Sequence, residues 1–342
     1  MWKFASYIKN HKIALLGVGK CLADRYENID YWSLYIDTSG WMVRRMFKLY
    51  EHLPRSLQKM AKGEYWYGEW KAHIADYDVV IICSGIRGRD VIEYIQDRNP
   101  NARILVHLES PLDDNDRKHP RFYRGLKNLE FSTFDKNDSI RYGIPFVRLY
   151  YDPEYFGPLS MPFHEIMKTA QKNGIQQDVY YVGHVHHRLD RLLEIQDILE
   201  TQGISHKFTL VKQRHHHYDR KYEPYLTDQE IPYAEVLQNV LQSRCILEVS
   251  QSYQRGMTYR AMEAAVFRKR LITSNPYAKD YEYYTSERVF ILGVDPIEKL
   301  KEFVRRECPW GGDKADISVY TPEHWLDKLL FGGEMPEAST CL

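Results

Sequence analysis

The 342-residue sequence is poor in cysteine and has no apolar stretch long enough to cross a membrane. Its five cysteines are scattered, odd in number and never spaced as a CxxC pair, which argues against a disulfide framework and a structural zinc site. No apolar run approaches the ~18 residues of a membrane-spanning helix. Residues 1–17 lack the pattern of a secretory signal peptide. We therefore expect a protein of the reducing cytoplasm.

An excess of charge of one sign is also missing. Lys+Arg and Asp+Glu are equal at 47 each, so the formal net charge is zero. Proteins that bind nucleic acid usually carry a basic excess, and the bulk charge therefore gives no reason to expect nucleic acid as a partner. The length exceeds what a single hydrophobic core usually reaches, which predicts two domains.

Two familiar nucleotide-binding signatures are absent. The segment "GVGKCLAD" at residues 17–24 has Leu22 where GxGxxG needs its third glycine, and GxxxxGK[ST] does not occur. Gly17 and Gly19 allow either a tight structural turn or a close approach of the backbone to a ligand or a facing domain, and both alternatives remain open.

A metal site is not expected either. The histidines of "HVHH" at residues 184–187 and "RHHHYD" at residues 214–219 are adjacent, so their side chains point to opposite sides and do not converge as metal ligands do. We expect no metal and no other cofactor.

What the sequence does contain is an alternation of short apolar runs and amphipathic stretches. Near-continuous apolar strands between helices are typical of a parallel sheet covered on both faces. The first half predicts strands at residues 12–19, 77–85, 102–111, 129–134 and 145–151. The second half predicts strands at 178–185, 206–212, 245–250, 269–275 and 288–293, with helices at 188–203, 233–244 and around Glu263.

This alternation of strands and helices predicts an α/β chain with Rossmann-like domains at residues 1–150 and 176–310. A linker at 151–175 joins them, and a C-terminal helix and tail at 311–342 could pack on either half. Two such sheets leave a cleft, and their ligands bind beyond the carboxyl ends of the strands. The candidate loops are residues 17–20, 84–87, 109–114, 183–188, 212–217 and 251–260.

Glu109 is the carboxylate that best fits a catalytic role. It follows the apolar run of "HLESPLDD" directly, at the edge where the loops gather. There it could act as a general base that deprotonates a hydroxyl, bind sugar hydroxyls, or cap a helix.

The segment from Gln254 to Asn275 carries the strongest functional signal. Gly256 lets the loop come close to a ligand, and the free N–H groups at the start of the following helix favour phosphate. Arg255 or Arg260 can add a forked guanidinium to a diphosphate. Glu263 lies one turn after Arg260 among apolar neighbours and needs a partner; the vicinal hydroxyls of a ribose would supply one. The alternative is a Glu–Arg pair on a solvated helix face.

On these residues, the sequence resembles the GT-B glycosyltransferases of bacterial capsule, lipopolysaccharide and O-antigen synthesis. "CILEVSQSYQRGMTYRAMEAAVFRKRLITSN" at residues 245–275 is similar to their donor-site segment. "FSTFDKNDSIRYGIPFVRLYYDPEYF" at 131–156 and "VYYVGHVHHRLDRLLEI" at 179–195 resemble the end of their acceptor domain and the start of their donor domain. The implied fold is α/β of the GT-B type, with two Rossmann-like parallel-sheet domains facing across a cleft.

The resemblance also implies roles by position. Glu263 would bind the nucleotide ribose, while Arg188 and Lys212 would neutralise the leaving diphosphate. The expected donor-binding residues are Gly183, His184, Arg188, Lys212, Gln254, Gly256, Met257, Thr258 and Glu263, and the expected acceptor-side residues are Gly17, Gly19, Ser84 and Gly85. The expected catalytic residues are Glu109 and Arg260.

One position departs from the family pattern. Many retaining members carry a glutamate eight positions before the ribose-binding one, and this sequence has Arg255 there. The role of that glutamate therefore cannot be transferred. With Glu109 as a base, inversion becomes the alternative to retention, and the sequence leaves the choice open.

The expected function is transfer of a hexose or related sugar from a UDP-, GDP- or CMP-linked donor to a saccharide or glycolipid in bacterial surface polysaccharide synthesis. A GT-B-like nucleotide-sugar 2-epimerase and a non-catalytic nucleotide-sugar-binding protein are the alternatives. The segment "WMVRRMFKLY" at residues 41–50 fits either a helix packed in the first domain or a peripheral contact with the inner face of the membrane.

Overall fold

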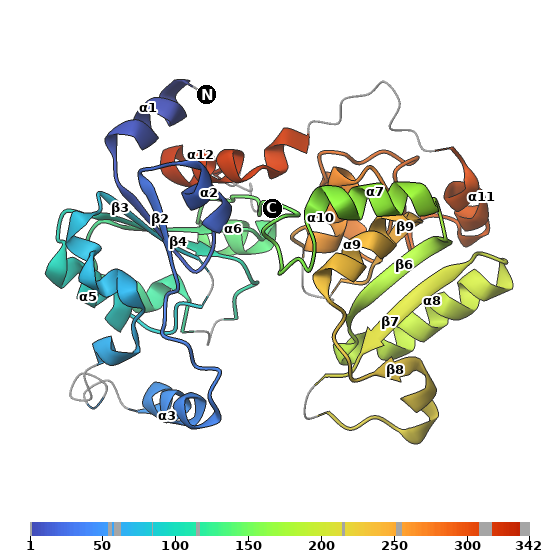
Figure 1. Ribbon diagram of the computed structural model, residues 1–342, viewed down its shortest axis with the longest axis horizontal. Coiled ribbons are helices and arrows are strands. Elements are labelled where there is room, and N and C mark those ends of the chain that lie inside the picture. Colours follow the sequence, from blue (N-terminus) through green and yellow to red (C-terminus); the bar gives the residue numbers. More distant parts are fainter. Residues whose placement is uncertain are drawn as a thin grey trace, which may run out of the picture. The chain divides into compact units, whose positions relative to one another are not determined.

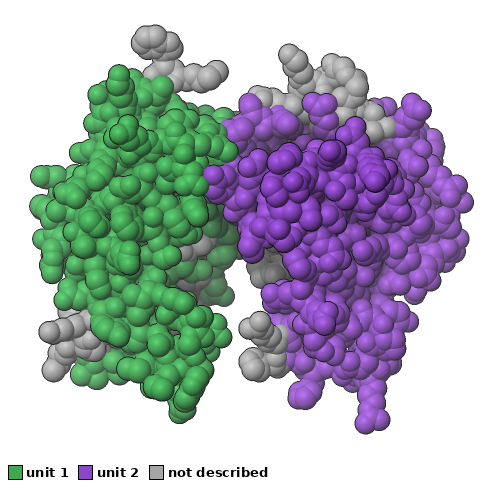
Figure 2. All heavy atoms as spheres, viewed as in Figure 1, with its two compact units in different colours: residues 1–150, 322–342 green, residues 151–321 purple. Residues whose placement is uncertain are grey.

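The computed structural model divides the chain into two compact units (Figure 2). Unit 1 comprises residues 1–150 and 322–342, and unit 2 comprises residues 151–321. The structure describes residues 2–53, 57, 63–83, 85–113, 117–213, 216–250, 255–307 and 317–335. The chain passes from unit 1 to unit 2 after Tyr150 and returns after Thr321.

Unit 1 is built on a five-stranded parallel sheet in the order β2-β1-β3-β4-β5. Its strands are β1 (Ile13–Leu16), β2 (Ile29–Trp32), β3 (Val79–Cys83), β4 (Arg103–Leu108) and β5 (Leu129–Thr133). Its helices are α1 (Trp2–Asn10), α2 (Lys20–Arg25), α3 (Trp41–His52), α5 (Asp90–Arg98), α6 (Lys136–Tyr142) and α12 (Pro322–Phe331).

The sheet of unit 1 has an apolar core on each face. Successive side chains of a strand point to opposite faces, so Ala14 and Leu16 belong to one core while Ile13 and Leu15 belong to the other. Every residue of β1 and β3 is buried. This explains why both strands appear in the sequence as continuous apolar runs rather than as alternating patterns.

The C-terminal helix α12 completes unit 1. Trp325, Leu326, Leu329 and Leu330 are buried in the same core as Ile13 and Leu15, and Figure 1 shows α12 beside α2. Of the two packing partners that the sequence allowed for this helix, the structure selects the first half of the chain.

Unit 2 is built on a six-stranded parallel sheet in the order β11-β10-β9-β6-β7-β8. Its strands are β6 (Gln177–His184), β7 (His206–Val211), β8 (Leu226–Thr227), β9 (Ser243–Glu248), β10 (Arg270–Thr273) and β11 (Val289–Ile291). Its helices are α7 (Phe163–Asn173), α8 (Leu189–Thr201), α9 (Tyr233–Leu241), α10 (Tyr259–Val266) and α11 (Leu300–Arg305). If β6 is counted as the first strand of the unit and the sheet is read from β8 to β11, the strand order is 3-2-1-4-5-6. This is the Rossmann arrangement.

The prediction of two parallel-sheet α/β units is confirmed. Residues 151–175, which we expected to form a linker, lie in unit 2 and contain α7, which packs on α9. The predicted strand at 145–151 is wrong: only Phe146 forms isolated bridges, to Thr133 and Glu334. Beyond this point the chain leaves the sheet and enters unit 2.

A buried carboxylate in unit 1 makes the stability of this unit depend on pH. Asp138 in α6 accepts a hydrogen bond from the Leu112 amide at 2.8 Å, and burial raises the pKa of Asp138 to about 6. The folded state therefore keeps a proton that the unfolded chain loses near pH 4. The corresponding stability is present at pH 4 and is lost as the pH rises to 7.

We expect Asp138→Asn to raise the free energy of unfolding at pH 7.5 by about 1–2 kcal/mol and to change it little at pH 4, because the amide cannot ionise. Urea denaturation at both pH values measures this. Asp97→Asn, which alters an exposed carboxylate on α5, is the control and should have little effect at either pH. An equal gain for Asp138→Asn at both pH values would contradict ionisation as the cause.

Candidate functional site

The strand order of unit 2 reverses between β6 and β9, and Rossmann sheets bind ligands at the carboxyl ends of the strands at this point. Arg188 lies just after β6. Its Nη1 donates to the Val249 carbonyl and its Nη2 to the His184 carbonyl at 2.8 Å, so the side chain joins the loops after β9 and β6. Its Nε is buried and has no hydrogen-bond partner within the described part of the chain. One donor of this guanidinium is thus left for an incoming acceptor.

The last residue of β9 is a buried carboxylate. Glu248 is 2% exposed; it accepts a hydrogen bond from Thr273 Oγ1 of β10 at 2.5 Å and another from Thr258 Oγ1. Burial raises the pKa of Glu248, and the two hydroxyls and the charge of Arg188 oppose this shift. The carboxylate therefore ties the ends of β9 and β10 to the residue before α10.

Thr258 is the N-cap of α10. Its Oγ1 accepts from the Ala261 amide at 3.4 Å, and its carbonyl accepts from the Met262 amide at 3.1 Å. Gly256 is buried and Met257 half-buried just before it. Through Glu248, the positive end of the α10 dipole is held at the carboxyl edge of the sheet, as the sequence predicted.

Glu263 and Arg260 pair with each other inside unit 2. Glu263 is 0% exposed; its Oε2 accepts from Arg260 Nη1, and its Oε1 accepts from Tyr233 at 3.3 Å and Tyr151 at 3.5 Å. Burial raises the pKa of Glu263, and Arg260 opposes the shift. The solvated-face alternative is excluded, but the partners of the carboxylate are side chains of the protein. A ribose would have to displace the two tyrosines.

His184 and Lys212 meet at a second place, the carboxyl ends of β6 and β7. His184 Nδ1 lies 3.2 Å from the Lys212 carbonyl, and both residues line a cavity of about 370 Å³ together with Asp228 and Glu230. Lys212 Nζ pairs with Asp228 at 3.3 Å and with Glu223 at 2.7 Å. The charge of Lys212 is therefore already balanced by two carboxylates. Gly183, the residue before His184, is still within β6.

In unit 1 the strand order reverses between β1 and β3. Gly17 and Gly19 follow β1, and Gly85 follows β3. Gly19 has a φ of 95°, and a Cβ there would lie 2.6 Å from Leu15 Cδ1, so the turn itself requires glycine. The need for glycine at position 19 is therefore explained by the turn, as in the first of the two alternatives, and a ligand is not required to explain it.

Glu109 follows β4 directly and is half-buried. Burial, and to a smaller extent the charge of Glu109, raise the pKa of the Cys83 thiol, which places this carboxylate near the end of β3. It therefore lies at the carboxyl edge of the unit 1 sheet, where we expected it.

Two of the predicted site residues, Ser84 and Gln254, lie outside the described residues. Among the residues that the structure does describe, no cluster of three His, Cys, Asp or Glu side chains could hold a metal ion. Within the same part of the chain, no helix combines the length and hydrophobicity needed to span a membrane.

Sequence reasoning missed Glu248, Tyr151 and Tyr233. A carboxylate that ends an otherwise apolar strand was a usable signal for Glu248, since a buried charge needs partners. The two tyrosines had no such signal, because each is one of 27 tyrosines and reaches Glu263 only through the fold.

The fold of this chain is similar to those of solved glycosyltransferases. AviGT4, a glycosyltransferase involved in avilamycin A biosynthesis, superposes with a TM-score of 0.50 at 13% identity over 77% of this chain and 74% of that chain. Anabaena Alr3699/HepE in complex with UDP-glucose superposes with a TM-score of 0.51 at 11% identity over 94% of this chain and 96% of that chain.

No family model matches the sequence, and no curated protein matches it. At identities this low the structural likeness concerns the fold. Together with the two parallel sheets, it shows that the chain has the GT-B fold, as the sequence resemblance implied.

Thr258 is expected to be the residue that secures the start of α10. Thr258→Val keeps the shape but removes the cap and one donor to the buried Glu248, so the free energy of unfolding should fall by about 1–3 kcal/mol. Thr258→Ser retains the hydroxyl and should cost less than about 1 kcal/mol. Urea denaturation of both variants measures the difference. Equal losses would show that the methyl group contributes as much as the hydroxyl and would contradict capping as the main contribution.

Proposed function

We propose that the protein is a glycosyltransferase that moves a sugar, a hexose or a close relative, from a nucleotide-sugar to a saccharide or glycolipid. The observation that carries this proposal is Arg188 at the switch point of the unit 2 sheet, whose buried Nε has no hydrogen-bond partner among the described residues. A guanidinium beside the N-terminus of α10 suits a diphosphate. The fold similarity to a protein crystallised with UDP-glucose supports the same ligand class.

The chemistry follows from where charge develops. The acceptor hydroxyl oxygen forms a bond to the anomeric carbon of the donor while the bond from that carbon to the diphosphate oxygen breaks. The bonding electrons leave with the nucleoside diphosphate, whose added charge Arg188 and the α10 N-terminus stabilise. The proton of the hydroxyl goes to Glu109. We assign the acceptor to bacterial capsule or lipopolysaccharide synthesis and the reaction to the cytoplasm.

Arg188→Gln should weaken binding of UDP, GDP or whichever nucleoside diphosphate binds by about tenfold to a hundredfold, the cost of losing a charge-assisted hydrogen bond. Isothermal titration calorimetry over a panel of nucleotides and nucleotide-sugars measures this. Arg191→Gln alters an exposed arginine on α8 that pairs with Glu194, and it is the matched control. If both variants bind like the native protein, Arg188 is not in the donor site.

Glu109→Gln separates the catalytic role from binding in the same experiment. Donor affinity should stay unchanged while sugar transfer to an added acceptor falls by about a hundredfold or more. Conversion of the donor without any acceptor would instead identify an epimerase. Donor binding with neither conversion nor transfer would identify a binding protein.

We further propose that α3 contacts the inner face of the membrane. One face of α3 packs Phe47 and Tyr50 against Trp66. The other exposes large apolar side chains: Trp41 at 72%, Met42 at 58%, Met46 at 54% and Leu49 at 63%. The cations Arg44, Arg45 and Lys48 are exposed on the same helix, and no ion pair is recorded for them in the described part of the chain. Apolar and basic side chains mixed on one helix favour an anionic bilayer surface.

Trp41→Ser/Leu49→Ser should lower co-sedimentation with phosphatidylglycerol vesicles by about tenfold, because two large apolar side chains no longer enter the interface. The exposed pair Val294→Ser/Ile297→Ser in unit 2 removes apolar surface elsewhere, from side chains that are 50% and 39% exposed, and should leave vesicle binding unchanged. Equal effects of the two pairs would contradict a specific contact through α3.

A further inference from the structure

A cavity at the opposite edge of the unit 2 sheet gathers positive charge. It measures about 450 Å³ and lies at the amino ends of β9 and β10. Five cations and one carboxylate line it: Arg244, Arg268, Lys269, Arg270, Arg306 and Glu307. The whole chain has equal numbers of the two charges, so this is a local concentration. Because β9 has six residues, its two ends lie about 16 Å apart, and the cavity is separate from the donor site.

Two of the five cations also serve the fold. Arg270 is buried, and its guanidinium donates to the carbonyls of Val304, at 3.2 Å, and of Arg306 and Glu307 at the end of α11. Lys269 Nζ donates to the Leu241 carbonyl at the end of α9, at 2.6 Å. Cations at helix C-termini offset the negative end of the dipole. These contacts explain why Lys269 and Arg270 are basic, but they do not explain the other three.

Arg270 also keeps an unused donor. It is 2% exposed, and its Nε has no hydrogen-bond partner within the described residues. A buried N–H without a partner is costly. A ligand that enters the cavity with an acceptor oxygen would satisfy this group.

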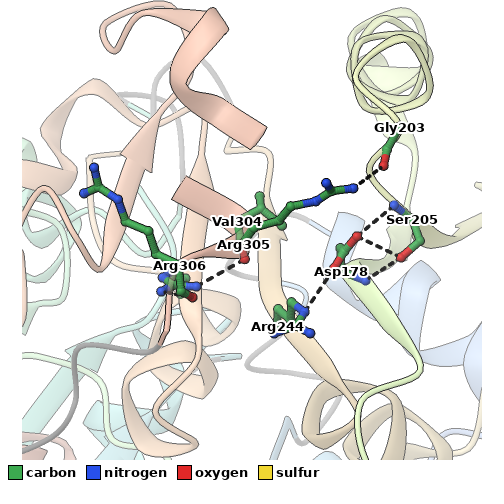
Figure 3. A network of polar contacts seen from close by, with 8 residues as sticks. Asp178, Gly203, Ser205, Arg244, Val304, Arg305 and Arg306 are labelled. Atoms are coloured by element: carbon green, nitrogen blue, oxygen red, sulfur yellow. Dashed lines mark hydrogen bonds and ion pairs between the residues drawn. The ribbon is translucent and has the colours of Figure 1, made fainter. Parts of the chain in front are cut away.

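Arg244 and Arg306 also line the cavity. Figure 3 shows Arg244 against Asp178, with 3.1 Å from Nε to Oδ1, and Arg306 on the neighbouring segment. The side chains of Arg244 and Arg306 are 45% and 55% exposed, and Arg306 pairs with Glu302 at the surface. Both side chains therefore line the cavity while part of their surface stays open to solvent.

Arg268 occupies a position that disfavours arginine. It follows α10 with a φ of 53°, in the left-handed region where glycine and asparagine are favoured. Its side chain is exposed and lines the cavity. The backbone conformation therefore does not explain an arginine at this position, whereas a charge that lines the cavity does.

We propose that this cavity is a binding site for a ligand carrying two or more adjacent phosphate groups. Guanidinium groups form paired hydrogen bonds to phosphate oxygens, and several cations around one cavity match several phosphates better than a single one. The site is independent of the donor site, because its residues lie at the other edge of the sheet.

Calorimetric titration of the full chain with inorganic pyrophosphate and tripolyphosphate at low ionic strength tests the proposal. We expect both to bind, and Arg268→Asn/Arg306→Gln to weaken that binding by about tenfold or more. Asparagine tolerates the left-handed conformation, so the fold should survive, and the thermal melting of the variant checks this.

Two control variants locate the effect. The proposed donor site would also take a diphosphate, so the titrations are repeated on Arg188→Gln, which removes that contribution. The binding that remains should be unchanged by the further change Arg191→Gln, on α8, and lost with Arg268→Asn/Arg306→Gln. Unaltered affinity in Arg268→Asn/Arg306→Gln, complete loss of binding in Arg188→Gln, or no binding by the native chain would each overturn the proposal. Because the binding is measured on Arg188→Gln, where the donor site is weakened, the result is independent of donor binding and of glycosyl transfer.

Discussion

The buried carboxylate of Glu248 is the interaction on which the carboxyl edge of unit 2 depends. A charge this deeply buried is unfavourable unless it is hydrogen-bonded, and Thr258 and Thr273 provide those bonds from two other segments. The strand ends and the start of α10 therefore have one arrangement in which all three groups are satisfied. Arg188, bonded to the carbonyl that follows Glu248, takes its position from the same arrangement.

The two edges of the unit 2 sheet differ in their helix ends. In a parallel α/β sheet, helices begin near the carboxyl ends of strands and finish near the amino ends. The start of α10 adds a positive dipole end to the charge of Arg188. The ends of α9 and α11 instead present carbonyls, which Lys269 and Arg270 neutralise. At the carboxyl edge the charge of Arg188 thus adds to the positive end of a helix dipole. At the amino edge part of the positive charge offsets the negative helix ends, and only the rest is left for a ligand.

The sequence predicted those strands whose burial on both faces imposes a continuous apolar pattern. Strands buried on both faces must be apolar throughout, and β3 and β4 were recognisable for that reason. The edge strand β2 is only half-buried and lacked this pattern. At the site, the place after a strand pointed to the loop at residues 183–188, and only the family resemblance singled out Arg188 within it. Glu248 left a signal as the carboxylate that ends an apolar strand, but its partners could not be predicted because they lie 10 and 25 residues away. For the same reason the tyrosines around Glu263 became visible only in the folded structure.

The return of the chain to unit 1 has a consequence for its biosynthesis. The ribosome makes residues 151–321 between the two parts of unit 1, so α12 emerges last. Until then, the core that receives Trp325 and Leu326 lacks its cover, and nascent apolar surface of this kind is prone to aggregate or to recruit chaperones. Unit 2 is contiguous and can fold once α11, whose Leu300 and Phe303 are buried in its core, is made. The later half of the polypeptide should therefore reach its native state before the earlier one.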